Sequence, residues 1–277
     1  MAQQEMAGKV VVITGASSGF GKGTACRFAE LGAYVVLSAR RVELIAELAE
    51  YCIALGGRAI PMPGDVSQRG DVERLADAAV REYGRIDVWV NNAGVGALGR
   101  FERIPIEDHQ QVIATNLMGT LYGSYYAYRQ FLKQRAGVLI NIASELGHAV
   151  PYCSSYAAAT HGVAGLGDSL RQEVRQAGLD EIHVCTVMPA AHDTPFFDHA
   201  ANYTGHEIRP PRPLHDPNDV VETVARLALY PDDGLQERIA AKPAHKMPVE
   251  ESPAAADSPN ALRAPMREGT EVSAGRR

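Results

Sequence analysis

The chain reads Val10-Val11-Val12-Ile13-Thr14-Gly15-Ala16-Ser17-Ser18-Gly19-Phe20-Gly21 near its start, and this stretch decides the fold. The branched apolar residues predict a buried β-strand, and the glycines after it predict a tight turn into a helix. Such a turn lets a pyrophosphate approach the backbone amides, and the following helix N-terminus favours an anion. We therefore expect a dinucleotide to be bound by Gly15, Ser17, Ser18, Gly19, Phe20 and Gly21.

Short apolar runs alternate with amphipathic stretches from this point to about residue 190. The runs predict six buried parallel strands, at Lys9–Thr14, Ala33–Ser38, Arg58–Met62, Ile86–Asn91, Gly137–Ala143 and Ile182–Met188. The stretches between them predict helices at Phe20–Leu31, Arg41–Leu55, Asp71–Tyr83, Ile106–Gln134 and Ser155–Gln176. This alternation predicts an α/β fold, a single Rossmann-type doubly wound parallel sheet with helices on both faces.

The length of 277 residues and the change in composition after about residue 230 predict one domain followed by a tail. Residues 1–229 are expected to form the dinucleotide-binding domain, including a substrate lid at 190–215 that is aromatic from Thr194 to Tyr203; ordinary helix packing is the alternative for that segment. Residues 230–277 are rich in proline, which is typical either of a disordered tail or of an ordered arm lying on a partner subunit.

Charge and cysteine content exclude several classes of protein. A net charge of −6 argues against nucleic acid as a partner, and the longest apolar runs are too short to span a membrane. The four cysteines have no metal-ligand or disulfide spacing, so we expect no metal site and a reduced, cytoplasmic protein.

The end of the second predicted strand indicates which cofactor is bound. Ala39 stands where a carboxylate would accept hydrogen bonds from a ribose, and Arg40 and Arg41 follow it. Two guanidinium groups suit a 2′-phosphate, which favours NADP(H) over NAD(H); a solvated basic pair is the alternative. Other cofactor contacts are expected beside the adenine and at the end of the fourth strand, from Asp65, Val66, Asn92, Ala93 and Gly94.

With these motifs in place, residues 7–229 resemble the short-chain dehydrogenase/reductase family. The resemblance is carried by Thr14–Gly21, Asp65, Asn91–Gly94, Asn116, Ser144, Tyr156, and Pro189 with Thr194. It implies that Tyr156 exchanges a proton with the substrate oxygen, that Ser144 hydrogen-bonds that oxygen and that Asn116 holds a relay water. It also implies cofactor contacts at Tyr156, Pro189 and Thr194.

The chain departs from the family pattern at Thr160, four residues after Tyr156, where the family has a lysine. That lysine binds the nicotinamide ribose and favours the tyrosinate, so its loss is expected to cost about 2–4 kcal/mol in transition-state stabilisation. His148 and His192, on loops expected to border the pocket, are candidate proton shuttles, although ordinary polar loop residues are the simpler interpretation.

The leading hypothesis is an NADP(H)-dependent oxidoreductase that interconverts a small apolar ketone and a secondary alcohol, with activity reduced by Thr160. A cofactor-binding pseudoenzyme, or an isomerase or lyase on the same scaffold, remains open. The resemblance also implies a homodimer or homotetramer in which the helices Ile106–Gln134 and Ser155–Gln176 pair across subunits.

Overall fold

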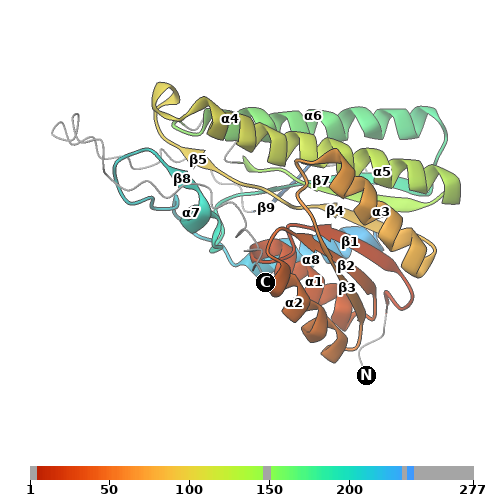
Figure 1. The fold of residues 1–277 in the computed structure, drawn as a ribbon. Coiled ribbons are helices and arrows are strands. Elements are labelled where there is room, and N and C mark those ends of the chain that lie inside the picture. Colours follow the sequence, from red (N-terminus) through yellow and green to blue (C-terminus); the bar gives the residue numbers. More distant parts are fainter. Residues whose placement is uncertain (1–4, 146–150, 233–235, 240–277) are drawn as a thin grey trace, which may run out of the picture.

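A single parallel sheet forms the centre of the protein (Figure 1). The computed structural model describes residues 5–145, 151–232 and 236–239. The strand order is β3-β2-β1-β4-β6-β7-β9, and every neighbouring pair is parallel. The strands of this sheet are β1 (Val10–Thr14), β2 (Tyr34–Ala39), β3 (Arg58–Pro63), β4 (Val88–Asn91), β6 (Gly137–Ile142), β7 (Ile182–Pro189) and β9 (Gln236–Ile239). The predicted doubly wound α/β fold is confirmed.

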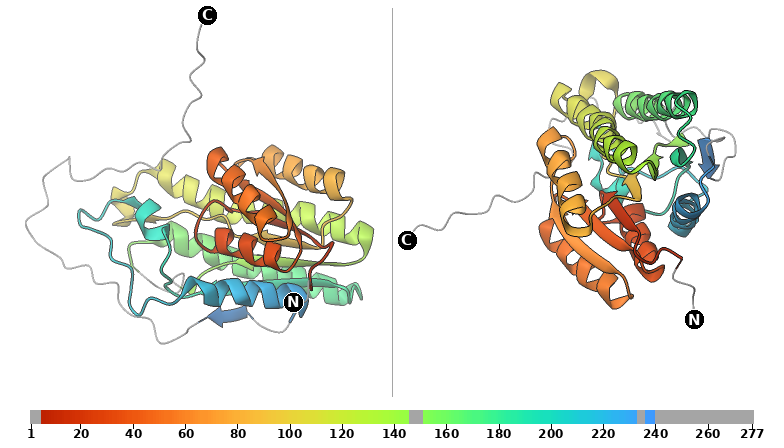
Figure 2. Two further views of the ribbon diagram at one scale, coloured as in Figure 1. Left: turned by 90° about the horizontal axis from the view of Figure 1, so that it is seen from below. Right: turned by 90° about the vertical axis from the view of Figure 1, so that its right-hand side faces the viewer.

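Helices cover both faces of the sheet, as the two views in Figure 2 show. One face carries α1 (Gly19–Glu30), α2 (Val42–Ala54) and α8 (Pro217–Leu229). The opposite face carries α3 (Arg69–Tyr83), α5 (Gly119–Gln134) and α6 (Ser154–Gln176). A smaller group beyond the carboxyl ends of the strands consists of α4 (Ile106–Ile113), α7 (Phe196–His199), β5 (Ala97–Leu98) and β8 (Ala201–Asn202).

Alternation of side chains along the strands divides the core into two layers. On β1, Val11 and Ile13 pack with α1, α2 and α8, whereas Val10 and Val12 pack with α3 and α5. All four side chains are fully buried or nearly so. Strands that are apolar on both faces require two helical layers, which explains why the sequence alternates as it does.

The structure contains elements that are not among those predicted from the sequence, including α8 and β9. Helix α8 begins at Pro217, where the Asp216 carboxylate caps the backbone N–H of Asn218, and β9 extends the sheet beyond β7. Strand β9 lies in the segment expected to be tail. The sequence Gln236-Glu237-Arg238-Ile239 carries one apolar residue, so an edge strand leaves no apolar run to detect. Residues 240–277, including the rest of the expected arm, lie outside the described residues.

The helix predicted at Ile106–Gln134 is interrupted. Residues 114–118 form a π-helical turn between α4 and α5. At this turn the Asn116 side chain is hydrogen-bonded to Val95, in the segment that follows β4. Periodicity of apolar residues does not distinguish such a turn from α-helix.

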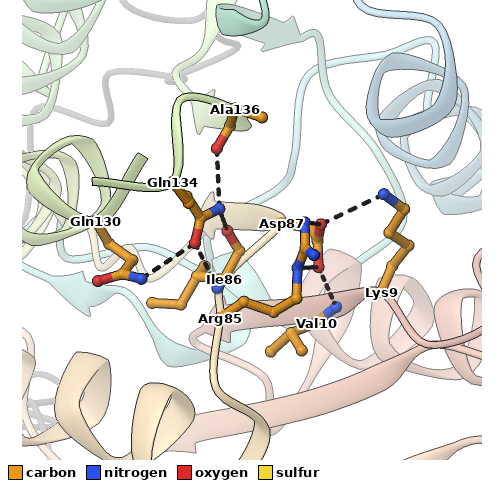
Figure 3. Close-up of polar contacts among 8 residues, drawn as sticks. All are labelled: Lys9, Val10, Arg85, Ile86, Asp87, Gln130, Gln134 and Ala136. Atoms are coloured by element: carbon orange, nitrogen blue, oxygen red, sulfur yellow. Dashed lines mark hydrogen bonds and ion pairs between the residues drawn. The ribbon is translucent and has the colours of Figure 1, made fainter. Parts of the chain in front are cut away.

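A buried carboxylate holds the amino ends of β1 and β4 together (Figure 3). Asp87 accepts a 2.9 Å hydrogen bond from the Val10 backbone N–H, and Arg85 binds its two oxygens at 2.6 and 2.9 Å. Lys9 adds an ion pair at 3.4 Å. This clamp lies at the end of the sheet opposite the glycine turn, so its contribution is structural.

The Gln134 side chain closes the same end of the sheet from the last turn of α5 (Figure 3). Its amide nitrogen donates to the backbone carbonyls of Ile86 and Ala136, and its oxygen accepts from Ile86 N–H and from Gln130. One side chain therefore satisfies backbone groups in the segments that lead into β4 and β6.

Candidate active site

A cleft of about 670 Å³ opens at the carboxyl ends of the central strands. Of the residues predicted from the sequence to bind the cofactor or, from the resemblance, to act in catalysis, all but Gly21 line it. The catalytic candidates Asn116, Ser144, Tyr156 and Thr160 lie in the same cleft as the cofactor-binding candidates Gly15, Ser17, Ser18, Gly19, Phe20, Arg40, Arg41, Asp65, Val66, Asn92, Ala93, Gly94, Pro189 and Thr194. Residues far apart in the sequence thus share one site.

The glycine turn is needed for close packing as well as for ligand approach. Gly15 has a φ of +66°, and a Cβ there would lie 2.7 Å from the Cα of Ala93. A Cβ on Gly21 would lie 2.4 Å from the Gly15 carbonyl oxygen and 2.5 Å from the Asn92 side-chain nitrogen. Gly21 therefore allows α1 to pack against the strand end, and it contributes to the site without lining the cleft.

The N-terminus of α1 faces this cleft without a cap of its own. The Ser18 side chain makes no capping hydrogen bond, and the first turn of the helix contains no acidic residue. Its backbone N–H groups and the positive end of the helix dipole are left for an anion. This donor set fits a pyrophosphate.

Arg41 connects the end of β2 to the glycine turn. Its guanidinium donates to the Ser17 hydroxyl at 2.8 and 3.1 Å and to the Ser18 hydroxyl at 2.8 Å. Arg40 is exposed and also lines the cleft. The two cations predicted to select the cofactor are therefore at the cleft, and Arg41 is already oriented by the loop.

Thr14 fixes the segment after β4. Its hydroxyl accepts from the backbone N–H groups of Asn92 and Ala93 at 3.0 and 3.2 Å and donates to the Val90 carbonyl. The Asn92 amide donates in turn to the carbonyls of Thr14 and Gly15 at 2.9 and 3.2 Å. These bonds lock the two strand ends that form the floor of the cleft.

A buried polar network holds β4 against α5. The Asn91 amide donates to Asn141 Oδ1 at 2.8 Å and to the Ser124 hydroxyl at 3.2 Å, and its oxygen accepts from the Trp89 indole at 2.8 Å. A Cβ on Gly123 would lie 2.0 Å from the Asn91 oxygen, so only glycine permits this approach. The polar atoms of the Asn91 side chain are all paired, whereas the Asn141 side-chain nitrogen is buried without a hydrogen-bond partner.

Both polar atoms of the Asn116 side chain are hydrogen-bonded to the backbone of the protein. Its Oδ1 accepts from the Val95 backbone N–H and its Nδ2 donates to the Val95 carbonyl, both at 2.9 Å. Its own backbone carbonyl accepts from the Thr120 hydroxyl at 2.8 Å. The side chain therefore holds the segment after Gly94 against the π-helical turn.

Tyr156 and Ser144 meet at the other end of the cleft. Burial raises the pKa of the Tyr156 phenol above its ordinary value, and a hydrogen bond from Ser144 opposes that rise. The nearby Cys153 thiol adds to the rise. At neutral pH the phenol is protonated and can donate to a substrate oxygen.

Thr160, where the resemblance implies a lysine, supplies no cation. Thr160 is buried, and its hydroxyl donates to the carbonyls of Tyr156 and Ala157 on its own helix at 3.0 and 3.1 Å. Among the described residues that line the cleft, the arginines are Arg40 and Arg41, beside the glycine turn. The electrostatic support for a tyrosinate is therefore absent from the described part of the cleft.

Aromatic residues from the segment after β7 cover the tyrosine. The Phe196 ring lies 5.3 Å from the Tyr156 ring, and Phe197 is buried beside Leu98. The Tyr203 hydroxyl donates to Asp108 on α4. The segment expected to be a lid thus packs over the end of the cleft that contains Tyr156, and Tyr203 attaches its far end to α4.

The histidine candidates differ in position. His148 lies outside the described residues. His192 lines the cleft, almost fully buried, and burial lowers its pKa. Its ring lies 5.3 Å from Phe20 and 5.5 Å from His215. No sequence pattern predicts the His192–His215 contact, since 23 positions separate the two residues.

The described residues show no sign of a metal site or of a membrane-spanning helix. No group of three His, Cys, Asp or Glu side chains among them is placed to hold a metal ion. In the same part of the chain no helix has both the length and the apolar character that crossing a membrane requires.

Comparison with known proteins identifies the family to which the chain belongs. The model of the short chain dehydrogenase family matches residues 9–203. An oxidoreductase of Bacillus subtilis is 35% identical over 226 residues, covering 80% of this chain and 63% of its own length, so this chain spans under two thirds of that relative. A 3beta-hydroxysteroid dehydrogenase of Eggerthella lenta is 36% identical over 234 residues, covering 81% of this chain and 88% of the relative.

Solved structures agree with the sequence matches. A short-chain dehydrogenase/reductase of Burkholderia phymatum in complex with NAD superimposes with a TM-score of 0.73 at 30% identity, covering 82% of this chain and 88% of that one. A metagenomic short-chain oxidoreductase in complex with NADP gives a TM-score of 0.71 at 29% identity, covering 87% and 100%. The chain therefore belongs to the short-chain dehydrogenase family of NAD(P)-dependent oxidoreductases.

Proposed function

We propose that this protein is an NADP(H)-preferring oxidoreductase that interconverts an apolar ketone and a secondary alcohol, with Tyr156 as the proton donor and acceptor. The observation that carries the proposal is the single cleft. It joins an uncapped helix N-terminus and two arginines at one end to a hydrogen-bonded Ser144–Tyr156 pair at the other.

The cofactor assignment rests on charge. The α1 N-terminus suits the pyrophosphate, and Arg40 and Arg41 suit a 2′-phosphate because guanidinium groups bind phosphate in a bidentate manner. When bound, a nicotinamide cofactor supplies or accepts the hydride. Asp65 and Val66 border the same end of the cleft and are assigned to the adenine.

The chemical roles follow from the protonation of Tyr156. Its raised pKa keeps the phenol proton at neutral pH, and Ser144 shares the substrate oxygen with it. Asn116 acts as a positioning residue, because both polar atoms of its side chain hold Val95. Without an ammonium at residue 160, the phenolate that forms during reduction is poorly stabilised, so we expect slow turnover.

The substrate class follows from the aromatic cover. Phe196 and Phe197 from the segment after β7 lie at the catalytic end, and they favour an apolar substrate over a charged one. The steroid dehydrogenase among the relatives is named for such a substrate. We assign this segment as the substrate lid.

Turnover of a ketone panel with NADPH tests the activity. Apolar cyclic ketones are expected to consume NADPH slowly, and Tyr156→Phe is expected to abolish consumption. Tyr83→Phe is the matched control, since Tyr83 packs on α3 away from the cleft, and it should leave the rate unchanged. If Tyr156→Phe consumed NADPH as fast as the unmodified protein, Tyr156 would not be the proton donor.

Titration of cofactor fluorescence tests the preference. Arg41→Ala is expected to weaken NADPH binding about 10- to 150-fold, which corresponds to a charged hydrogen bond of about 1.5–3 kcal/mol, and to change NADH binding much less. Arg69→Ala, on α3, is the matched control. If Arg41→Ala weakened the binding of NADPH and NADH equally, the role of Arg41 would be only to hold the glycine loop, since its guanidinium also binds Ser17 and Ser18.

One observation favours a second candidate, a cofactor-binding protein without turnover. The Thr160 hydroxyl is bound to its own helix, and the described arginines of the cleft lie at the far end from Tyr156. Tight NADPH binding with no consumption of any ketone, in the unmodified protein and in Thr160→Lys alike, would select this candidate.

A further inference from the structure

Two cysteines lie in the same apolar cluster, one on α1 and one on α2, outside the cleft. These helices pack side by side on one face of the sheet (Figure 1). Cys26 on α1 is half-buried, and Cys52 on α2 is fully buried in the same apolar cluster. Both thiols are free, and each is the first cause of the other's pKa shift.

Charge around Cys26 favours its ionised form. Its pKa is lowered to about 7, first by the hydrogen bond from Cys52 and then by Lys22 one turn earlier on α1, against burial and Glu30 one turn later. The Cys52 pKa is raised by the same hydrogen bond and by burial. A half-buried thiolate beside a buried thiol is the arrangement of an attacking and a resolving cysteine.

We propose that Cys26 and Cys52 form a peroxide-reactive pair that closes a reversible disulfide between α1 and α2. The Cys26 thiolate attacks a hydroperoxide, the O–O bond breaks, and Cys26 becomes a sulfenic acid as an alkoxide or hydroxide departs. The Cys52 sulfur then attacks the Cys26 sulfur, the S–O bond breaks, and the Cys52 proton leaves with the hydroxyl group as water. The hydroperoxide is reduced by two electrons, one from each thiol.

The disulfide would join the two helices whose N-termini border the cofactor cleft. Helix α1 begins at Gly19 in the glycine turn, and the residue that precedes α2 is Arg41. Oxidation of the pair therefore acts on the scaffold of the cofactor site without touching Ser144 or Tyr156.

Thiol counting after a brief exposure to hydrogen peroxide tests the proposal. The unfolded, reduced chain has four thiols. We expect one equivalent of peroxide to remove two of them, dithiothreitol to restore them, and peptide mapping to find Cys26 linked to Cys52 of the same chain. Cys153 and Cys185 serve as internal controls, because both are buried and burial raises the pKa of Cys153 to about 11.

Single variants separate the two roles. Cys52→Ser is expected to leave a Cys26 sulfenic acid that dimedone labels, and Cys26→Ser is expected to leave Cys52 unmodified at the same peroxide dose. Three results would overturn the proposal. They are retention of all four thiols, a disulfide between two chains, or equal dimedone labelling of Cys26 and Cys153. None of these measurements requires turnover, so failure here is distinct from failure of the proposed reaction.

Discussion

Replacing Thr160 by lysine tests the interpretation of the catalytic end most directly. Thr160 lies one helical turn after Tyr156, its side chain is buried, and its hydroxyl binds carbonyls of its own helix, so it supplies no charge. An ammonium about 5 Å from the phenolate at an effective dielectric constant near 20 stabilises it by about 3 kcal/mol. That amounts to about two pKa units for Tyr156 and a rate gain of about 100-fold at pH 7.

The assay is the pH dependence of kcat/KM for alcohol oxidation. Oxidation needs the phenolate, so in the unmodified protein the rate should rise tenfold per pH unit until it passes the raised pKa of Tyr156. Thr160→Lys should move the bend of this profile to lower pH. Thr160→Met is the matched control, because it has comparable reach without charge. Identical profiles for the lysine and methionine variants would refute the electrostatic reasoning.

Other predictions concern the scaffold. Asp87→Ala should lower the free energy of unfolding by about 2 kcal/mol, because the Val10 N–H loses its acceptor, whereas Lys9→Ala, at a half-exposed ion pair, should cost under about 0.5 kcal/mol in urea denaturation. Gly15→Ala should abolish NADPH binding in fluorescence titration, since its φ is +66° and a Cβ would lie 2.7 Å from Ala93. Tyr125→Glu, on the exposed face of α5, should convert an expected oligomer to monomers in light scattering.

The glycine turn and the positions of the six predicted strands were predictable because each has a strong local cause. The expectation that all six are buried was wrong for β3, which is an edge strand and is partly exposed. Four consecutive branched residues at Val10–Ile13 have few alternatives to a buried strand, and the turn after them is glycine-rich for steric reasons that the structure confirms at Gly15 and Gly21. The placement of Arg41 at the cleft was also predictable. Its bonds to Ser17 and Ser18 were not, because they depend on how β1 and β2 pair.

The elements that escaped prediction have weak or non-local causes. The π-helical turn around Asn116 is stabilised by Val95, which is 21 positions away, so no local periodicity reveals it. Strand β9 pairs with β7 as an edge strand with little apolar character. Helix α8 did have a readable start, since Asp216-Pro217 is a capping residue followed by proline at the first helical position.

In the proposed reaction, the absence of a cation at residue 160 would affect both directions to the same extent. The equilibrium between ketone and alcohol at a given pH does not depend on the protein, so a variant cannot raise kcat/KM for oxidation without raising it equally for reduction. Below the pKa of Tyr156 reduction should be independent of pH, and above it reduction should fall tenfold per unit as oxidation levels off. The raised pKa places that bend above the ordinary tyrosine value. Thr160→Lys should therefore move the bends of both profiles together, and a shift in one direction alone would show that a group other than Tyr156 carries the proton.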